Sequence, residues 1–335
     1  MSFNISLERQ IGSSTLASAG YVGAFGRHLL TVHAANPGIP ALCLSLSKPE
    51  DVAPGTPTCG PFGENGVYTR SDGTVVNGTR APFPNTIGTD AYYENMGNSR
   101  YHGLELTLQR KTGALTWLAS YTYSKSIDQT SSMQEQVDPF DYHRLDGISA
   151  FDIKHNFVVS YSYELPFSKF LGDSRWTNGW AISGVTRFAS GLPVTFASFG
   201  DNYLVQVQNN GVNSVSLDMP NCASGDLQLN HNPRNGLPYF NTSLFAPNAF
   251  GTQGNCKRRM FYGPGMDNFD MVLRKLTRIS EGKTIELRFE TFNTFNHAQF
   301  YPNGSVDGNI NSPTFGKVLK AAPPRIGQLA LKFTF

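Results

Sequence analysis

The chain has 335 residues, enough for one large β domain or two ordinary ones, and its 27 basic and 25 acidic residues leave a net charge of +2. This balance argues against a nucleic-acid surface, which needs a basic excess on one face. Charged residues make up only 16% of the chain, and 24 Phe and 14 Tyr accompany abundant Gly, Asn, Ser and Thr. Such a mixture favours half-buried strands and polar loops over helices. No stretch approaches the roughly 20 uninterrupted apolar residues of a transmembrane helix.

Residues of alternating character predict nine strands along the chain. The first runs to about Arg9 and the second from Thr15 to Phe25, with a tight turn at Gly12 between them. The remaining strands are expected at 101–110, 115–123, 152–164, 180–199, 268–278, 284–295 and 325–335. Long connections are expected at 27–98, 127–150, 200–266 and 296–323. Gly191-Leu192-Pro193 predicts a bulge or bend inside the strand at 180–199.

The N-terminus lacks the features of a signal peptide. Residues 1–9 contain no basic segment, no long apolar segment and no small-residue cleavage site. Their pattern is that of a β-strand from the first residues onward. We therefore expect the chain to be a mature or an incomplete form of a secreted or outer-membrane protein.

The expected connections alternate between short and long from one end of the chain to the other. A soluble sandwich has no reason to keep this alternation, whereas transmembrane β-barrels pair short periplasmic turns with longer extracellular loops. Strands of about ten residues also suit a tilted crossing of the bilayer. The pattern predicts an all-β, antiparallel transmembrane barrel segment in the outer membrane of a Gram-negative bacterium.

Two faces can be assigned from the cost of charge in lipid. In residues 285–290 the odd positions are apolar and the even positions charged. A charge facing lipid at the bilayer midplane costs about 2–4 kcal/mol, so the charged positions should face the lumen. The predicted lumen-facing polar residues are Glu105, Arg187, Glu286, Arg288 and Glu290. Tyrosines and Trp117 on the opposite face should lie near the aromatic girdles at the membrane interfaces.

The chain ends on an amphipathic strand whose last residue is aromatic, which is typical of outer-membrane barrels. The positions expected to signal to the barrel-assembly machinery are Leu329, Leu331, Phe333 and Phe335. Nine strands conflict with the even strand number of bacterial single-chain barrels. An open edge in lipid would also leave backbone groups unpaired. We therefore expect residues 1–335 to be the C-terminal part of a larger barrel, unless a strand has been missed or merged, for instance at Gly191.

Several segments together resemble the Oar-like TonB-dependent transporters. The resemblance runs in order from about residue 99 to the end, and is specific as a series, although each segment alone is weak. Residues 1–98 fit only generally, as a hairpin and a surface loop. The matching segments are 99–110 (SRYHGLELTLQR), 119–126 (ASYTYSKS), 151–157 (FDIKHNF), 164–167 (ELPF), 179–180 (GW), 190–193 (SGLP), 262–265 (YGPG), 268–270 (NFD) and 290–297 (ETFNTFNH).

The resemblance implies a 22-stranded barrel with a plugged lumen. Members of that family carry a signal peptide, often a carboxypeptidase-regulatory-like domain, and then a plug with a TonB-contacting segment. The sequence shows no counterpart of these parts, which puts transport by this chain alone in doubt. The implied function is energy-coupled uptake of a scarce, bulky solute. The implied partners are outer-membrane lipid and lipopolysaccharide, the barrel-assembly machinery, an unknown solute, and the TonB complex through the missing N-terminal region.

The four cysteines fall as local pairs in expected loops, and predict the disulfides Cys43–Cys59 and Cys222–Cys256. Free thiols or crossed pairing remain open. No cysteine or histidine spacing indicates a metal site, no cofactor is expected, and no catalytic motif is present. Histidines such as His102 and His155 are read as interfacial or structural. The one basic cluster, residues 257–259, is interpreted as a solvated loop or a lipopolysaccharide contact.

Three rival functions remain open. A surface adhesin would use the same long loops without energy coupling. An outer-membrane hydrolase would need a Ser/His/carboxylate set at one rim, and would lose activity on mutation of His143 or His155; no motif supports it. A soluble β-sandwich binder would be extracted without detergent. We expect a receptor rather than an enzyme, and kinship of fold does not identify its solute.

Overall fold

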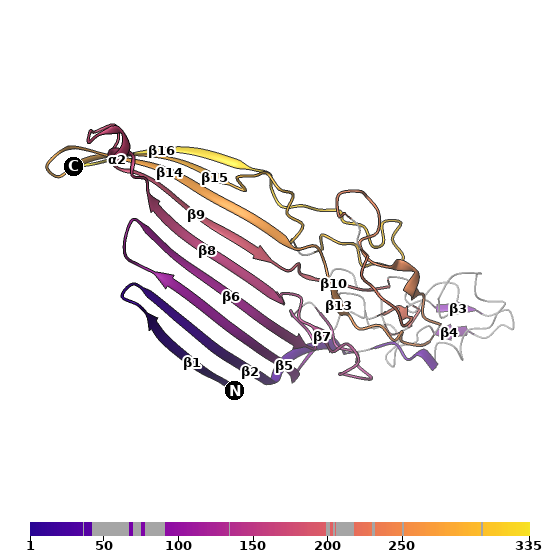
Figure 1. Ribbon diagram of the computed structural model, residues 1–335. Helices are drawn as coiled ribbons and strands as arrows, with labels where there is room; N and C mark the ends of the chain where they lie inside the picture. Colours follow the sequence, from indigo (N-terminus) through magenta and orange to yellow (C-terminus); the bar gives the residue numbers. More distant parts are fainter. Residues whose placement is uncertain are drawn as a thin grey trace.

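The computed structural model describes residues 1–35, 37–41, 67–69, 75–77, 91–133, 135–198, 202–203, 205, 218–229, 232–249, 251–302 and 304–335. Its main feature is one antiparallel sheet of nine long strands in the order β1-β2-β5-β6-β8-β9-β14-β15-β16, with the short β7 beside β6 (Figure 1). Each long strand pairs with its neighbour in this list. The bounds are β1 Ser2–Ile11, β2 Thr15–Ala34, β5 Ala91–Arg110, β6 Leu115–Asp128, β7 Gly147–Ile148, β8 His155–Glu164, β9 Trp180–Ala189, β14 Met266–Ser280, β15 Lys283–Phe292 and β16 Ile326–Thr334.

Smaller elements lie at the two ends of the sheet. At one end, tight turns join the strands, and the short helix α2 (Phe167–Leu171) lies near the C-terminus (Figure 1). At the other end the long connections gather. Their described residues hold three two-stranded sheets and one 3-10 helix: β3 (Val67–Thr69) with β4 (Val75–Asn77), β10 (Pro193–Thr195) with β13 (Arg259–Tyr262), β11 (Asn221–Cys222) with β12 (Phe245–Ala246), and η2 (Thr242–Leu244).

The fold class predicted from the sequence is confirmed at the level of the sheet, because the chain forms an all-β antiparallel sheet with short turns at one end and long loops at the other. The edge strands of the nine-strand path are β1 and β16. No helix in the described part of the chain has the length and apolar character that crossing a bilayer requires.

Two strands are about twice as long as expected. The predicted loop 27–98 is wrong at both ends, because β2 continues to Ala34 and β5 begins at Ala91, so that each has 20 residues. The ladder between them continues past irregularities at Gly26/Leu29 and Leu29/Leu30. His28 takes a φ of 54° there and absorbs the extra residue of the bulge. The hairpin therefore extends beyond the neighbouring strands into the loop end.

The strand expected at 180–199 is two strands in two sheets. β9 ends at Ala189, and β10 leaves the main sheet to pair with β13. Proline at 193 lacks the N–H that an interior ladder position requires. A Cβ on Gly191 would lie 2.2 Å from the carbonyl oxygen of Gly263. Only glycine therefore allows the two backbone segments to lie this close together. The break adds no strand to the main sheet, which keeps nine long strands.

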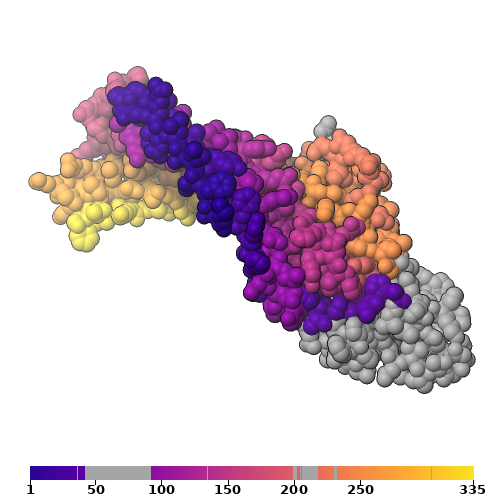
Figure 2. Space-filling view, turned by 90° about the horizontal axis from the view of Figure 1, so that it is seen from below, coloured from indigo at the N-terminus to yellow at the C-terminus, as the bar shows by residue number. Residues whose placement is uncertain are grey.

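The buried apolar core lies among the loops and not on the sheet. Its residues come from β10, β12, β13 and the connections around them: Val194, Phe196, Phe240, Phe245, Cys256, Phe261 and Val306. The sheet instead leaves its large apolar side chains exposed, as with Leu329 and Leu331 of β16, which are 70% and 72% exposed. Figure 2 shows this division, with the loop residues gathered at one end of a thin curved wall. The sheet therefore has no buried apolar layer comparable to the one in the loops.

Candidate functional site

The pairing register gives the nine-strand sheet one polar and one apolar face. Leu287 pairs with Leu331, and Phe289 pairs with both Leu273 and Leu329. One residue along, Glu290 pairs with Gln328. Because directly paired residues point to the same side, the alternation within each strand extends across the whole sheet.

All five predicted lumen residues lie on the polar face by this register. The structure brings three of them together, since Arg288 lies 3.0 Å from Glu290 and 3.5 Å from Glu286. Arg187 donates from Nε to Oδ1 of Asn156 at 2.8 Å. Glu105 lies apart from them on β5, three strands from Arg187 in the sheet order. These charges line a wall and do not form a single cluster.

The predicted aromatic residues lie on the apolar face, with two histidines among them. Tyr21 and Tyr121 place their hydroxyl groups 2.7 Å and 2.8 Å from Nδ1 of His102 and His155. Tyr123 also packs against His155, with ring centroids 5.1 Å apart. The interpretation of these histidines as structural agrees with these contacts.

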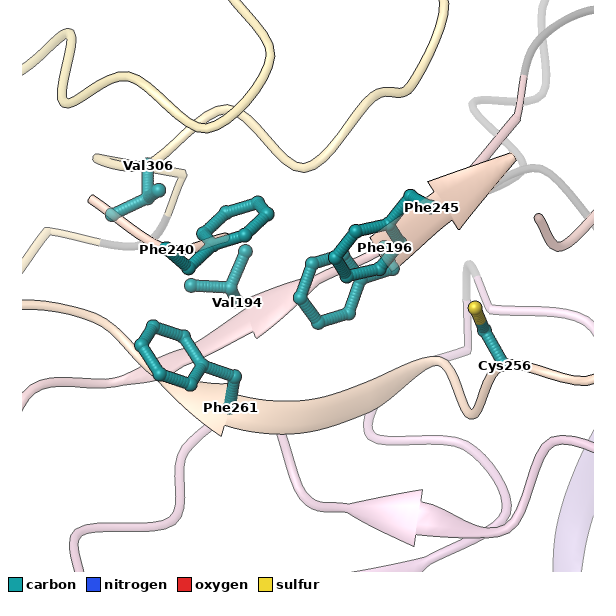
Figure 3. Close-up of a cluster of buried hydrophobic side chains, with 7 residues drawn as sticks. All are labelled: Val194, Phe196, Phe240, Phe245, Cys256, Phe261 and Val306. Carbon is teal, nitrogen blue, oxygen red and sulfur yellow. The ribbon is translucent and has the colours of Figure 1, made fainter. Parts of the chain in front are cut away.

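Above the sheet, the loops form a layer with its own hydrophobic centre. Figure 3 shows the phenylalanine rings of this core turned toward one another. Phe240 is fully buried, and its ring lies 5.3–5.7 Å from those of Phe196, Phe245, Phe261 and Phe315. Edge-to-face packing of this kind fixes the relative positions of segments that are distant in the sequence.

The same layer contains a disulfide between Cys222 and Cys256, the pair predicted from the sequence, with Cα atoms 5.2 Å apart. It joins β11 to the segment that leads into β13, across 34 residues of chain. Asn255 reinforces this link, since it accepts from the backbone N–H of Cys222. The predicted pair Cys43–Cys59 lies outside the described residues.

The interpretation of residues 257–259 as a solvated cluster is wrong for two of the three. Arg258 is fully buried and Arg259 is 2% exposed. Both contact Glu135, with Arg258 at 3.3 Å and Arg259 at 2.5 Å, and Arg259 also lies 3.7 Å from Asp128. The driving force is local charge balance: two guanidinium groups meet two carboxylates where water cannot reach. Only Lys257 remains exposed, and its Nζ donates to the carbonyl of Arg144.

This ion network joins two loops. Arg259 donates from Nε to the carbonyl of Ile148 at 2.7 Å, and Arg258 donates to that of Gln136 at 2.7 Å. Burial raises the pKa of the Glu135 carboxyl, but its hydrogen bond to Arg259 and the two arginine charges outweigh burial and lower that pKa overall. Burial lowers the pKa of Arg258 to about 10, which is still well above neutral pH, so this guanidinium stays charged. The segment 128–148 is thereby held against β13.

A second polar centre surrounds Asp218, which is 1% exposed. Its carboxylate accepts from Nδ2 of Asn248 and from the backbone N–H of Asn202, each at 2.6 Å. Burial is the largest influence on this carboxyl and raises its pKa to about 6, in spite of these hydrogen bonds. The centre joins three loop segments around a carboxylate that is costly to ionise.

Acidification should therefore stabilise the contacts around Asp218. Because the folded pKa of about 6 lies above the ordinary value of 3.8, the stabilisation is complete below about pH 4 and is lost as the pH rises to about 6. We expect the free energy of opening this segment to be roughly 2 kcal/mol higher at pH 4 than at pH 7. Hydrogen exchange of peptides containing Asn202 or Asn248, corrected for intrinsic rates, measures it. The Asp218→Asn variant should lose this dependence, and a flat profile in the unmodified chain would contradict the assignment.

One hollow of about 490 Å³ opens between β10 and the loop before β16. Val194, Thr195, Val306 and Lys320 are among the residues that line it. Asp307 at its wall accepts from the backbone N–H of Asn309 at 2.9 Å and from the hydroxyl of Thr314 at 2.6 Å. This arrangement is that of a hydrogen-bonded turn. Among the described residues, no cluster of His, Cys, Asp and Glu is arranged to hold a metal ion.

The sequence matches the family described as "Outer membrane beta barrel domain" over residues 1–328. A comparison with curated proteins finds no match. Among solved structures, the chain is similar to the outer membrane transporter YddB from Escherichia coli, with 10% identity and a TM-score of 0.48. It is also similar to the ferric-catecholate import receptor Fiu from Escherichia coli K12, with 13% identity and a TM-score of 0.41. The siderophore receptor PirA from Acinetobacter baumannii is similar as well, with 14% identity and a TM-score of 0.43. These matches cover all of this chain but only 32%, 27% and 32% of the three structures.

Proposed function

The chain belongs to the outer membrane beta barrel domain family, and from this premise we propose that it forms part of a TonB-dependent receptor that takes up a scarce, bulky solute. Family membership places it in the bacterial outer membrane. The proposal puts the apolar face of the sheet in contact with lipid. The finer assignment rests on the residues that resemble the Oar-like transporters. The function proposed is binding and passage, without a catalytic step.

The observation that carries this proposal is the pairing of a charged inner wall with a cross-linked loop layer above it. Loops that only connected strands would not need a phenylalanine core, a disulfide and a buried ion network. Preorganised loops lower the entropy lost on binding, which suits capture of a dilute solute. Arg288 with its two glutamates, and Arg187, would then offer polar contacts below the layer.

The proposal includes closure of the barrel by further strands. Each edge strand, β1 and β16, would leave a row of N–H and C=O groups unpaired in lipid, at several kcal/mol for each group. Pairing of both edges with other strands of the same receptor removes this penalty. The assembly machinery would read the terminal pattern at Leu329, Leu331, Phe333 and Phe335, and TonB would act through a region outside the 335 residues.

Uptake in cells tests the proposal. Solutes taken from the medium are compared by mass spectrometry in a strain with the gene disrupted, in a strain without the energising complex, and in their parent. We expect one solute to enter at least tenfold more slowly in both altered strains. A receptor carrying Glu286→Gln and Arg288→Gln should slow the same solute, whereas Leu287→Val on the lipid face should not.

Two results would contradict coupled uptake. One is a solute set that does not differ between the strains. The other is surface binding that depends on the gene but persists unchanged without the energising complex, with no uptake lost. The second result would favour the adhesin.

A further inference from the structure

The lipid-facing side of the sheet carries basic residues at the end where the long loops lie. Arg100 of β5 pairs with Phe25 and Ile127, and Lys125 of β6 pairs with His102. By the alternation these positions share the apolar face with Leu104 and its neighbours. Arg100 and Lys125 are both exposed. Their charges therefore face outward, away from the lumen.

A hollow of about 210 Å³ lies beside Arg100, and Arg27 forms another of its walls. Asp128 and Asp146 also line it, and Oδ1 of Asp146 is buried without a hydrogen-bond partner among the described residues. Asp128 accepts from the hydroxyl of Ser131 at 2.8 Å and Asp146 lies 3.2 Å from Nδ1 of His143. Arg27 and Arg100 are both exposed, so their guanidinium groups can reach an anion outside the protein, and a guanidinium binds phosphate through two parallel hydrogen bonds.

Below these charges, the surface changes in steps toward the membrane centre. The next level holds the Tyr21–His102 and Tyr121–His155 contacts, which are amphipathic groups of the kind found at the level of lipid headgroups. Farther down, an apolar hollow of about 690 Å³ opens where three alanines stand among large side chains. The alanines are Ala17, Ala19 and Ala119, and the large apolar neighbours are Leu7, Leu106, Leu108, Trp117, Tyr121 and Phe157. Arg9, Ser18 and Thr107 complete the lining.

The spacing of these features suits one amphipathic molecule. From Arg100 to Leu106 the strand advances six residues, which is roughly 20 Å at about 3.3 Å per residue. A phosphorylated headgroup at the rim and an acyl chain in the alanine hollow would thus lie on the same strip of β2, β5 and β6. A solute inside the lumen could reach neither.

We propose that this strip is a binding site for a phosphorylated lipid of the outer leaflet. Arg27, Arg100 and Lys125 hold its phosphate, and the hollow at Ala17, Ala19 and Ala119 holds an acyl chain. The proposal rests on the orientation in the proposed function, with the long loops outward. It is independent of which solute is taken up.

Native mass spectrometry of the complete receptor that contains this chain, held in a neutral detergent, tests the site with diphosphorylated lipid A as the probe. We expect Arg100→Gln combined with Lys125→Gln to raise the apparent Kd at least tenfold. The control is Arg110→Gln, an exposed arginine on the same strand and face at the opposite end, which should change the Kd less than twofold. Dephosphorylated lipid A should bind the unmodified chain at least tenfold more weakly. Ala119→Phe, which fills the hollow, should raise the Kd for lipid A several-fold.

The assay can also overturn the site. Equal binding by the double variant, or equal weakening by Arg110→Gln, would show that the rim charges do not define it. Displacement of lipid A by inorganic phosphate would show that the arginines take free phosphate instead of a lipid. Heat-modifiable gel migration establishes that each variant is folded. Because lipid binding is measured without uptake, failure here would leave the solute assay unaffected.

Discussion

Replacing Glu135 with Ala should detach the segment 128–148 from β13. The change leaves Arg258 and Arg259 buried against a single carboxylate, that of Asp128, which lies 3.7 Å from Arg259. Removing one partner of a buried ion pair costs about 3–5 kcal/mol, because an uncompensated charge remains. We expect hydrogen exchange in peptides from 128–149 and from 258–262 to accelerate at least a hundredfold.

The matched control is Glu286→Gln, which removes a carboxylate from an exposed pair. Its partner Arg288 is 45% exposed at the side chain, so solvent can replace the lost interaction. Exposed pairs contribute about 0–1 kcal/mol, and exchange in the loops should remain as in the unmodified chain. If both variants exchanged alike, Glu135 would not be the residue that holds these loops together.

The main sheet was predictable because its signal is local. Polar and apolar residues alternate, as at Glu286 and Leu287, because one face of the sheet is polar and the other apolar. This pattern can be recognised in each strand separately. The outward or inward direction of the five lumen residues follows from parity alone. What parity could not show is where a strand ends: β2 and β5 continue past Gly26 by means of a bulge at His28, for which the sequence has no distinct signal.

The loop layer was not predictable because its contacts join distant residues. Arg258 and Glu135 are 123 positions apart, and nothing in either neighbourhood indicates the other. The sequence shows three consecutive basic residues at 257–259, and a charged run usually faces solvent. Arg258 and Arg259 are buried because another loop brings Glu135 to them, and the local sequence does not show this. The cysteines are the exception in this layer, since 222 and 256 are far from the other two in the sequence.

Phe240→Ala should loosen the loop layer while leaving the nine-strand sheet intact. Phe240 is fully buried at the centre of four other rings, and truncating a buried Phe to Ala costs about 3–5 kcal/mol through lost contacts and a cavity. None of the seven core residues belongs to the nine long strands. We therefore expect faster proteolysis of the loops on intact cells, with unchanged heat-modifiable migration of the barrel.

Phe170→Ala is the control, because this phenylalanine lies on α2 at the opposite end and is 80% exposed. Its loss should change the free energy of unfolding by no more than about 0.5 kcal/mol and leave loop proteolysis as it was. Phe240→Leu should fall between the two, since it refills most of the cavity. If Phe240→Ala instead unfolded the sheet as readily as the loops, the layer and the wall would be one cooperative unit. Solute capture would then depend on the wall as much as on the loops.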